Sequence, residues 1–338
     1  MSSPLVSIII PVYNVEEYLE ECLNSLINQT LQNFEVICIN DCSTDNSLNI
    51  LNKYSKNDSR FITISTTENS GPSKARNLGI SIAKGEFITC LDSDDYFTPD
   101  TLESLYSNAT SNQLDMIVFC AKPFCDKKGE FPLSSEMYTR CPTKLTQIMF
   151  GQEFFASTIE YDNHIGTVAI KFFRTSLIKE NNIRFIEGIL HEDEPFYYEC
   201  ILLAKRVTKI PNQFYCRRYR AGSITTTTKT SKHVIGKLVG INRILEISKS
   251  IKLPKQALEA TMTLISAIAN NLTSDYYSLD NTELEKLNAL PYEQQHLLQL
   301  LIGVSNGKRL ATIEKSFSFK LGLALTKPIR IIADLFNH

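Results

Sequence analysis

The chain lacks a strong charge of either sign: its 338 residues contain 35 Lys and Arg against 37 Asp and Glu, a formal net charge of -2. Proteins that bind nucleic acid in general carry a clear basic excess, so we do not expect a nucleic-acid partner. The start, Met1-Ser2-Ser3-Pro4, has no signal-peptide pattern, and the first apolar run is too short to cross a bilayer. No internal repeat or low-complexity segment occurs. These absences indicate a globular cytoplasmic protein.

The nine cysteines form no Cys-x-x-Cys motif and no Cys/His spacing of a structural zinc site. Their number is odd, and Cys38, Cys90 and Cys120 lie inside strand-like runs. This usage predicts reduced thiols in the cytoplasm rather than a disulfide framework.

What the sequence does contain is an alternation of two patterns in its first hundred residues. Continuous apolar runs predict strands at Leu5–Ile10, Phe34–Asn40, Phe61–Ser65 and Phe87–Leu91. Helical spacing predicts helices between them at Glu16–Asn28, Ser43–Lys56 and Ser73–Ala83. This alternation predicts an α/β fold: a doubly wound, mostly parallel sheet with helices on both faces.

The pattern is less regular afterwards and becomes helical near the end. Further helices are predicted at Thr101–Ser107, Ser176–Asn181 and Glu194–Ala204, and strands at Asp115–Cys120, Val168–Arg174, Arg206–Ile210 and Gln213–Arg220. A C-terminal helical region follows, at Val234–Ile251, Lys255–Leu272, Leu284–Leu301 and from Ile313. We therefore predict three parts: residues 1–100, 101–228 and 229–338.

An acidic run, Leu91-Asp92-Ser93-Asp94-Asp95, comes directly after the fourth strand. Carboxylates this close repel each other unless a cation lies between them. Hard oxygen ligands favour Mn²⁺ or Mg²⁺, which are commonly shared with a substrate phosphate. The run therefore predicts a metal site for a diphosphate-bearing substrate; the alternative is a solvated acidic turn before Pro99.

A cluster of polar residues follows each of the four predicted strands. In sheets of this kind, ligands bind beyond the carboxyl ends of the strands. The clusters are Tyr13-Asn14, Asp41, Asn69–Arg76 and Asp92–Asp95. A base can stack on Tyr13 for about 1–3 kcal/mol, and Asp41 can accept a hydrogen bond from a base N–H. The alternatives are a packed loop aromatic for Tyr13, a helix N-cap for Asp41, and an ordinary helix start with a solvated Arg76.

Six segments in order resemble the family 2 glycosyltransferases with the GT-A fold, over roughly residues 5–225. They are Val6–Asn14, Asn40–Asp45, Asn69–Asn77, Leu91–Asp95, His191–Phe196 and Tyr219–Ile224. The resemblance implies the following site residues: nucleotide contacts from Pro11, Tyr13, Asn14, Asp41, Gly71, Ser73, Arg76, Asp92 and Ser93; diphosphate contacts from Arg220 and Ser223; a metal ligand in Asp94; and catalytic carboxylates in Asp193 and Glu192.

The activity implied is transfer of a sugar from a nucleotide-sugar donor, with a UDP-sugar as the leading choice. Asp193 matches the family's catalytic carboxylate, and general-base catalysis contributes about 10²–10⁴-fold. One base without a covalent intermediate implies direct displacement with inversion. The alternative is that Glu192 and Asp193 only favour a helix N-terminus.

The acceptor implied is a hydroxyl of a glycan or lipid-linked molecule, in the synthesis of a surface glycan such as capsule or lipooligosaccharide. One departure concerns this side: relatives often carry Trp-Asn before the position of Lys171, where this chain has Ala169-Ile170 and no Trp anywhere. The departure predicts that the acceptor side differs in shape from that of those relatives, so acceptor inferences drawn from them are unsafe.

Residues 308–330 carry a charge of +5 among apolar residues such as Phe317, Phe319 and Leu321. A basic amphipathic segment predicts peripheral binding to the inner face of the membrane; the alternative is a core helix or a homo-oligomer contact. Pro328 interrupts a continuous helix in either case.

Two other classes compete with the transferase. A nucleotidyltransferase shares the sheet and the acidic site, but it is expected to carry a glycine-rich basic loop after the first strand, and Pro11–Glu17 has no Gly, Lys or Arg. A non-catalytic module that binds a nucleotide or metal is the second alternative, and the Glu192-Asp193 element argues against it.

Overall fold

The computed structural model describes residues 3–125, 133–220 and 228–305. Contacts among these residues divide the chain into two compact units. The first contains the residues up to 188 and those from 196 to 220; the second contains residues 189–195 and those from 228 onward. No helix of the described ranges is long and apolar enough to cross a membrane.

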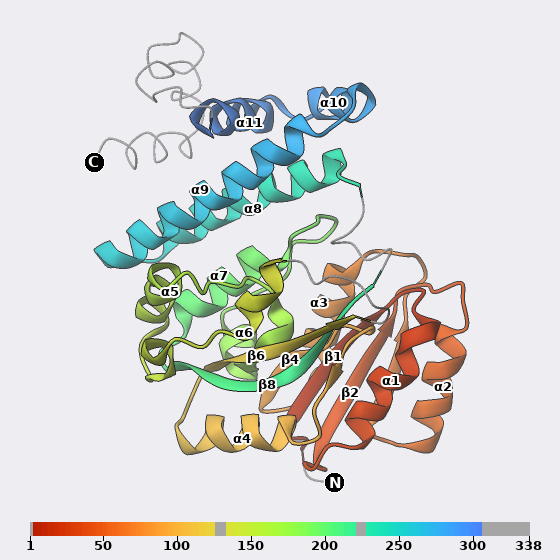
Figure 1. The fold of residues 1–338 in the computed structure, drawn as a ribbon. Helices are drawn as coiled ribbons and strands as arrows, with labels where there is room; N and C mark the ends of the chain where they lie inside the picture. Colours follow the sequence, from red (N-terminus) through yellow and green to blue (C-terminus); the bar gives the residue numbers. More distant parts are fainter. Residues whose placement is uncertain (1–2, 126–132, 221–227, 306–338) are drawn as a thin grey trace. The chain divides into compact units, whose positions relative to one another are not determined.

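The first unit is built on one mixed sheet with the strand order β3-β2-β1-β4-β7-β6-β8-β5 (Figure 1). Its strands are β1 (Val6–Val12), β2 (Phe34–Asn40), β3 (Phe61–Ser65), β4 (Phe87–Cys90), β5 (Tyr96–Phe97), β6 (Met116–Cys125), β7 (Lys171–Arg174) and β8 (Val207–Tyr219). Its helices are α1 (Glu16–Ile27), α2 (Ser47–Asn57), α3 (Pro72–Ile82), α4 (Thr101–Ser111), α5 (Gly151–Glu160) and α6 (Thr175–Glu180), with 3₁₀ turns η1 (Leu133–Tyr138), η2 (Thr143–Thr146) and η3 (Val168–Ile170).

The parallel half of the sheet consists of β1 to β4, and β1 lies between β2 and β4. Alternate residues of a strand face opposite sides. Ile8 and Ile10 therefore pack in the core with Leu23 of α1 and Leu51 of α2. Ile9 faces the other side, against Gly79 of α3. Both faces are covered by helices, which explains why β1 is apolar along its length.

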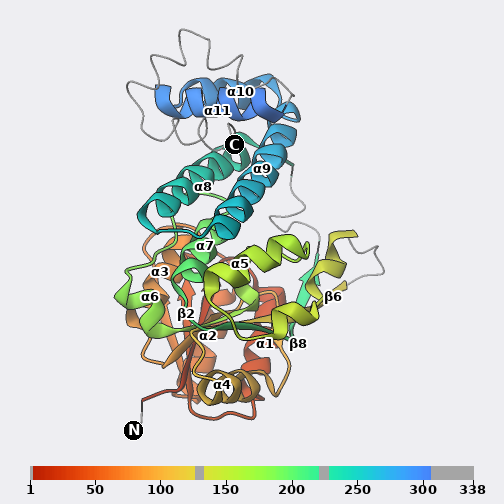
Figure 2. The same cartoon turned by 90° about the vertical axis from the view of Figure 1, so that its left-hand side faces the viewer.

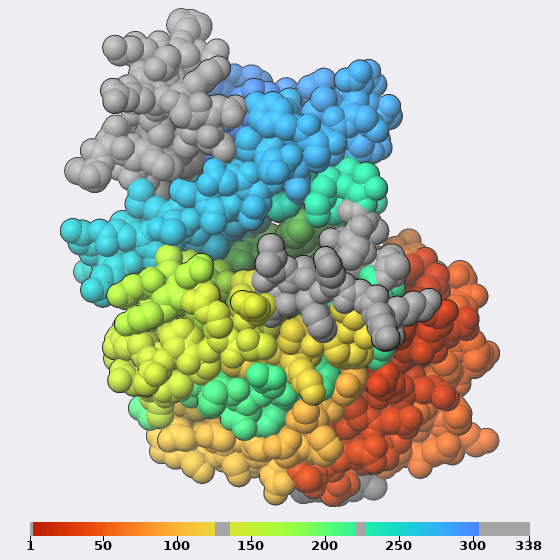
Figure 3. All heavy atoms as spheres, in the orientation of Figure 1, coloured from red at the N-terminus to blue at the C-terminus, as the bar shows by residue number. Residues whose placement is uncertain are grey.

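The other half is largely antiparallel, because β7 runs against β4 and β6, while β6 and β8 are parallel to each other. On this half, α4 lies on one face and α5 and α6 on the other (Figures 1 and 2). In the space-filling view the red and darker orange residues of the N-terminal part gather on the right-hand side of this unit (Figure 3).

The second unit is helical. It contains α8 (Ser231–Ser250), α9 (Lys255–Tyr277), α10 (Asn281–Asn288) and α11 (Tyr292–Ser305). The short segment 189–195 belongs to it, because Leu190 contacts α8 so closely that a Cβ on Gly236 would lie 2.2 Å from the Leu190 carbonyl oxygen. One helix, α7 (Asp193–Leu203), begins in this segment and ends in the first unit.

The predicted fold class is confirmed, including the C-terminal helical region. Several element boundaries are wrong. The two strands predicted around Pro211 are one strand, β8, because the exposed Pro211-Asn212 pair is absorbed as an irregularity in its pairing with β6. The helix predicted at Leu284–Leu301 is two helices, since Pro291 separates them. The strand predicted at Val168–Arg174 begins as the turn η3, and β5 and α5 were not predicted at all.

Candidate active site

The four predicted polar clusters lie at one edge of the sheet. Because β1, β2, β3 and β4 are parallel and adjacent, their carboxyl ends meet at this edge (Figure 1). Pro11 lies inside β1, one residue before its end, and Tyr13 follows the strand with 48% of its side chain exposed. A packed role for Tyr13 is therefore wrong, and its ring is open to a ligand.

Asn14 joins the loops that follow β1 and β2. Its backbone is in the left-handed region with φ 46°. Its amide oxygen accepts a hydrogen bond from the Thr44 backbone N–H at 2.8 Å, and its own backbone N–H donates to the Ser43 hydroxyl at 3.2 Å. The side chain therefore holds the two loops together beside Tyr13.

Asp41 is buried at the end of β2, with 3% exposure. Its carboxylate accepts hydrogen bonds from the backbone N–H groups of Ser70 and Gly71, at 3.0 and 2.7 Å, and from the Thr66 hydroxyl at 3.0 Å. The alternative of an N-cap is wrong, because α2 begins at Ser47 with Asn46 as its cap. Asp41 organises the loop that follows β3.

This loop leads into α3 through Gly71, whose φ of 83° favours glycine, and Pro72 is the first helical residue. Ser73 is 1% exposed, and its hydroxyl has no hydrogen-bond partner among the described residues. Arg76 is also buried, and its guanidinium pairs with Asp92 at 3.0 Å and lies over the ring of Phe185. A solvated Arg76 is therefore wrong: the arginine links α3 to the acidic run.

The carboxylates of the acidic run have different partners. Asp94 accepts a hydrogen bond from Nε of Arg220 at 2.8 Å. Asp95 is buried and accepts from the Tyr215 hydroxyl and from the Arg218 backbone N–H at 2.6 Å. Ser93, between Asp92 and Asp94, is partly exposed. The run is therefore anchored to β8 rather than being a solvated turn.

Burial raises the pKa of Asp95 to about 8, and the negative charges of Asp94 and Asp92 add to the effect. The hydrogen bonds from Arg218 and Tyr215 act in the opposite direction. Asp95 is thus protonated at neutral pH in the absence of a cation. Its position fits a structural role in holding the loop, whereas Asp94 remains partly accessible, with 21% of its side chain exposed.

The arginines at the end of β8 alternate between two faces, as strand geometry predicts. The guanidinium groups of Arg218 and Arg220 both lie 4.9 Å from the ring centre of Tyr18. Arg217 lies 4.6 Å from the ring centre of Tyr138. Arg220 pairs with Asp94, whereas Arg217 lies near Asp92 and Asp95. Ser223 lies outside the described residues, as does the predicted C-terminal membrane segment.

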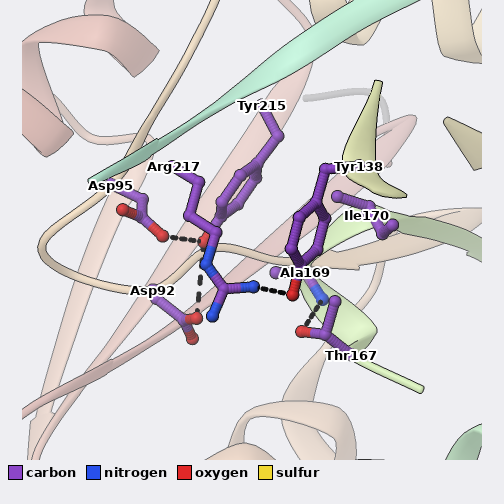
Figure 4. A pocket seen from close by; sticks show the side chains of 8 residues that line it. All are labelled: Asp92, Asp95, Tyr138, Thr167, Ala169, Ile170, Tyr215 and Arg217. Carbon is purple, nitrogen blue, oxygen red and sulfur yellow. Dashed lines mark hydrogen bonds between the residues drawn. The ribbon is translucent and has the colours of Figure 1, made fainter. Parts of the chain in front are cut away.

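A small pocket opens beside Asp92 (Figure 4). It is lined by Asp92, Asp95, Tyr138, Thr167, Ala169, Ile170, Tyr215 and Arg217. Tyr138 and Arg217 contact each other at its side through the phenol oxygen and the guanidinium. The departure noted at Ala169-Ile170 therefore falls on the wall of this pocket.

Lys171 shapes that wall and was not recognised from the sequence. It is fully buried, and its Nζ donates to the carbonyl oxygens of Ile165 and Thr167 at 2.9 and 3.0 Å. Its ammonium also lies 4.4 Å from the ring centre of Tyr197. A lysine inside an apolar strand run was the available signal, because a buried lysine needs acceptors.

Glu192 and Asp193 lie in segment 189–195 of the second unit, where Asp193 is the first residue of α7. Glu192 is 8% exposed and Asp193 is partly exposed. This place at the start of a helix agrees with the alternative that the two carboxylates only favour the helix N-terminus. Their catalytic role stays a prediction. His191 has a φ of 65°, and its ring centre lies 5.8 Å from that of His233 in α8.

The residues present suit a divalent cation that is shared with a substrate. No cluster of three or more His, Cys, Asp or Glu side chains that could hold a metal occurs in the part of the chain that the structure describes. Mg²⁺ and Mn²⁺ are commonly held by one or two carboxylates together with substrate phosphates. Asp94 is a hard oxygen donor with 21% of its side chain exposed, and a cation that binds there would compete with Arg220.

Comparison with known proteins identifies the family. The profile described as "Glycosyl transferase family 2" matches residues 7–181, more than half of the chain. The chain belongs to this family, and the resemblance seen in its motifs is confirmed.

Two curated relatives show how far the similarity extends. Glycosyltransferase GlyG of Streptococcus pneumoniae is 31% identical over 228 residues, which cover 67% of this chain and 74% of GlyG. The poly(ribitol-phosphate) beta-glucosyltransferase of Bacillus spizizenii is 37% identical over 207 residues, covering 60% of this chain but 30% of that protein. The match thus spans less than a third of the second relative.

Two solved structures are similar to the fold. S. aureus TarS 1–349 in complex with UDP-GlcNAc has a TM-score of 0.62 at 24% identity, covering 89% of this chain and 80% of TarS. The mannosyltransferase PcManGT from Pyrobaculum calidifontis, in complex with GDP-Man and Mn²⁺, has a TM-score of 0.54 at 15% identity, covering 100% and 85% of the two chains. At these identities the similarity establishes the GT-A type fold.

Proposed function

We propose that this chain is an inverting, metal-dependent glycosyltransferase that moves a sugar from a UDP-sugar to a hydroxyl of a glycan or lipid-linked acceptor. The observation that carries this proposal is the edge of the parallel sheet, where Tyr13, Asp41, Arg76 and Asp94 follow four adjacent strands. TarS, a relative in fold, binds UDP-GlcNAc, which supports the choice of uridine.

The donor is held, in this proposal, by residues of the first unit. Tyr13 stacks on the base, and Asp41 orders the loop around Gly71 and accepts from the base with its remaining lone pairs. Arg220 and Ser223 contact the diphosphate, and Asp94 holds Mn²⁺ or Mg²⁺. A divalent cation bound there supplies charge neutralisation for the departing nucleoside diphosphate.

Asp193 is the proposed base. A sugar hydroxyl is a weak nucleophile, and a carboxylate that accepts its proton as the new bond forms lowers the barrier. The hydroxyl then displaces the nucleoside diphosphate directly, so the anomeric configuration is inverted. Glu192, its buried neighbour, helps to hold the segment in place.

The cellular role proposed is surface-polysaccharide synthesis, as the ribitol-phosphate polymer named for one relative suggests. Peripheral attachment to the inner face of the membrane through residues 308–330, and assembly as a homo-oligomer, stay predictions. The family assignment disfavours the nucleotidyltransferase and binding-module alternatives.

A thermal-shift series with UDP, GDP, CDP and ADP, each with and without Mn²⁺, tests the donor site. A ligand at about 100 times its Kd adds roughly 2.7 kcal/mol to stability. We expect stabilisation by UDP that requires Mn²⁺ and is lost in Asp94→Ala but kept in Asp162→Ala, an exposed control. Preference for another nucleotide would contradict the UDP assignment, and no response to any nucleotide would overturn the donor site.

A further inference from the structure

Two cysteines of the first unit, Cys120 and Cys141, lie next to each other. Cys120 is fully buried on β6, and Cys141 is half-buried shortly after η1. The Cys120 Sγ lies 3.7 Å from the carbonyl oxygen of Arg140, the residue before Cys141, and the two thiols are close enough for each to shift the pKa of the other. Two thiols in contact can form a disulfide where the backbone permits it.

A buried lysine fixes this arrangement. Lys209 on β8 is 1% exposed, and its Nζ donates to the Arg140 carbonyl oxygen at 2.8 Å and to Oδ1 of Asn163 at 2.5 Å. Nδ2 of Asn163 donates to the same carbonyl at 3.3 Å. The peptide that precedes Cys141 is therefore held against β6 and β8 by several donors.

The surroundings make the two thiols unequal. The interaction with the Cys120 thiol and the positive charge of Lys209 lower the pKa of Cys141 to about 7, although burial opposes them. The interaction with Cys141 and burial raise the pKa of Cys120. A thiol whose pKa lies near the ambient pH combines a large thiolate fraction with good nucleophilicity.

We propose that Cys120 and Cys141 form a peroxide-reactive dithiol site, in which Cys141 attacks the oxidant and Cys120 resolves the product. The Cys141 thiolate attacks one oxygen of hydrogen peroxide, so that an S–O bond forms, the O–O bond breaks, and the departing hydroxide takes up a proton to become water. Cys120 then attacks the Cys141 sulfur; an S–S bond forms, the S–O bond breaks, and the Cys120 proton leaves with the hydroxide as a second water. Two thiols are oxidised and one peroxide is reduced.

The disulfide would tie the chain just after Tyr138 to β6. Tyr138 lines the pocket beside Asp92. Formation of the disulfide under oxidising conditions would therefore restrain the wall of that pocket to which Tyr138 belongs. The inference does not depend on sugar transfer, and its test needs no donor or acceptor.

The test treats the full chain, freed of reductant, with one equivalent of hydrogen peroxide at pH 7. Peptide mass spectrometry is expected to find Cys120 linked to Cys141, and dithiothreitol should reverse the link. Cys42→Ser and Cys125→Ser are matched controls, since these are the other half-buried cysteines, and both should still form the bond. Oxidation of Cys42 or Cys125 as fast as Cys141 would overturn the proposal, as would oxidation of Cys141 without any linked peptide.

A second measurement avoids substitution of a buried residue. Native protein is alkylated with iodoacetamide at pH 7, and each cysteine is quantified. A thiol of pKa about 7 is more ionised than one of pKa about 8.5 by roughly 15-fold but is intrinsically less nucleophilic, which leaves about a threefold advantage. Cys141 should react faster than Cys42 and Cys125, which are buried to a similar degree, and equal rates would contradict its assignment as the attacking thiol.

Discussion

Arg220 donates a hydrogen bond from Nε to Oδ2 of Asp94 at 2.8 Å. Arg220, which we assign to the diphosphate, is therefore hydrogen-bonded to Asp94, which we assign to the metal. A cation that binds Asp94 must compete with this pair, and an arginine displaced from it becomes available to a phosphate. The pair thus predicts a coupling between metal binding and the position of Arg220.

Removing the arginine should strengthen metal binding without nucleotide. Both side chains are about one-fifth to one-quarter exposed, and such a pair contributes at most about 1 kcal/mol. Calorimetric titration should therefore show Mn²⁺ binding up to about fivefold tighter in Arg220→Met, together with weaker UDP binding. Arg60→Met is the control, because Arg60 has a similar exposure and pairs with Asp58 instead. Weaker Mn²⁺ binding in Arg220→Met would show that the arginine does not compete.

Replacing the proposed base should affect the reaction and not the donor. In Asp193→Asn we expect the rate of sugar transfer to fall by about 10²–10⁴-fold, while the thermal shift with UDP and Mn²⁺ is unchanged. Glu192→Gln, the neighbouring carboxylate, should lose less activity. Full transfer activity in Asp193→Asn would leave the residue with a structural role at the start of α7.

Asp41→Asn should destabilise the protein. The amide would present an NH₂ group to the N–H donors of Ser70 and Gly71, so at least one buried hydrogen bond is lost. The free energy of unfolding, measured with urea, should fall by about 1–3 kcal/mol. Asp162→Asn should change it little, since the side chain of Asp162 is 99% exposed. No loss in Asp41→Asn would mean that the loop around Gly71 does not depend on this carboxylate.

The buried Asp95 should make stability depend on pH in the absence of metal. Its pKa is about 8 when folded and about 4 when unfolded. Between these values the folded state binds the additional proton, so the free energy of unfolding decreases as pH rises from about 4 to about 8. Urea unfolding with EDTA across this range should show a decrease in the parent protein that is smaller in Asp95→Asn and unchanged in Asp162→Asn. Equal slopes in the parent and Asp95→Asn would contradict the raised pKa.

Lys171→Met should loosen the pocket wall. The substitution keeps an unbranched side chain one atom shorter than lysine, but it leaves the carbonyl oxygens of Ile165 and Thr167 without the ammonium. We expect a loss of about 2–4 kcal/mol in the free energy of unfolding. Lys53→Met, whose lysine is 64% exposed in an ion pair with Glu20, should change it by less than about 1 kcal/mol. Similar values for both variants would show that the buried ammonium contributes nothing net.

The parallel half of the sheet could be predicted almost residue by residue. β2 and β3 have the predicted bounds, because each is a short run rich in β-branched and aromatic residues that is bounded by polar residues. β5 was missed, because a two-residue strand, Tyr96–Phe97, has no periodicity to detect. Helical spacing continues on both sides of Pro291, and the proline separates it into α10 and α11.

The order and spacing of its motifs were enough for the sequence to determine the family, the α/β class and the edge of the sheet at which Tyr13, Asp41 and Asp94 lie. Those features depend on local periodicity and on the rule that parallel strands end at one edge. Only the tertiary structure decided the partners: Arg76 on Asp92, Arg220 on Asp94, and Cys141 beside Cys120 and Lys209. Such pairs join residues far apart in the chain, and their contacts depend on how the strands pair across the sheet.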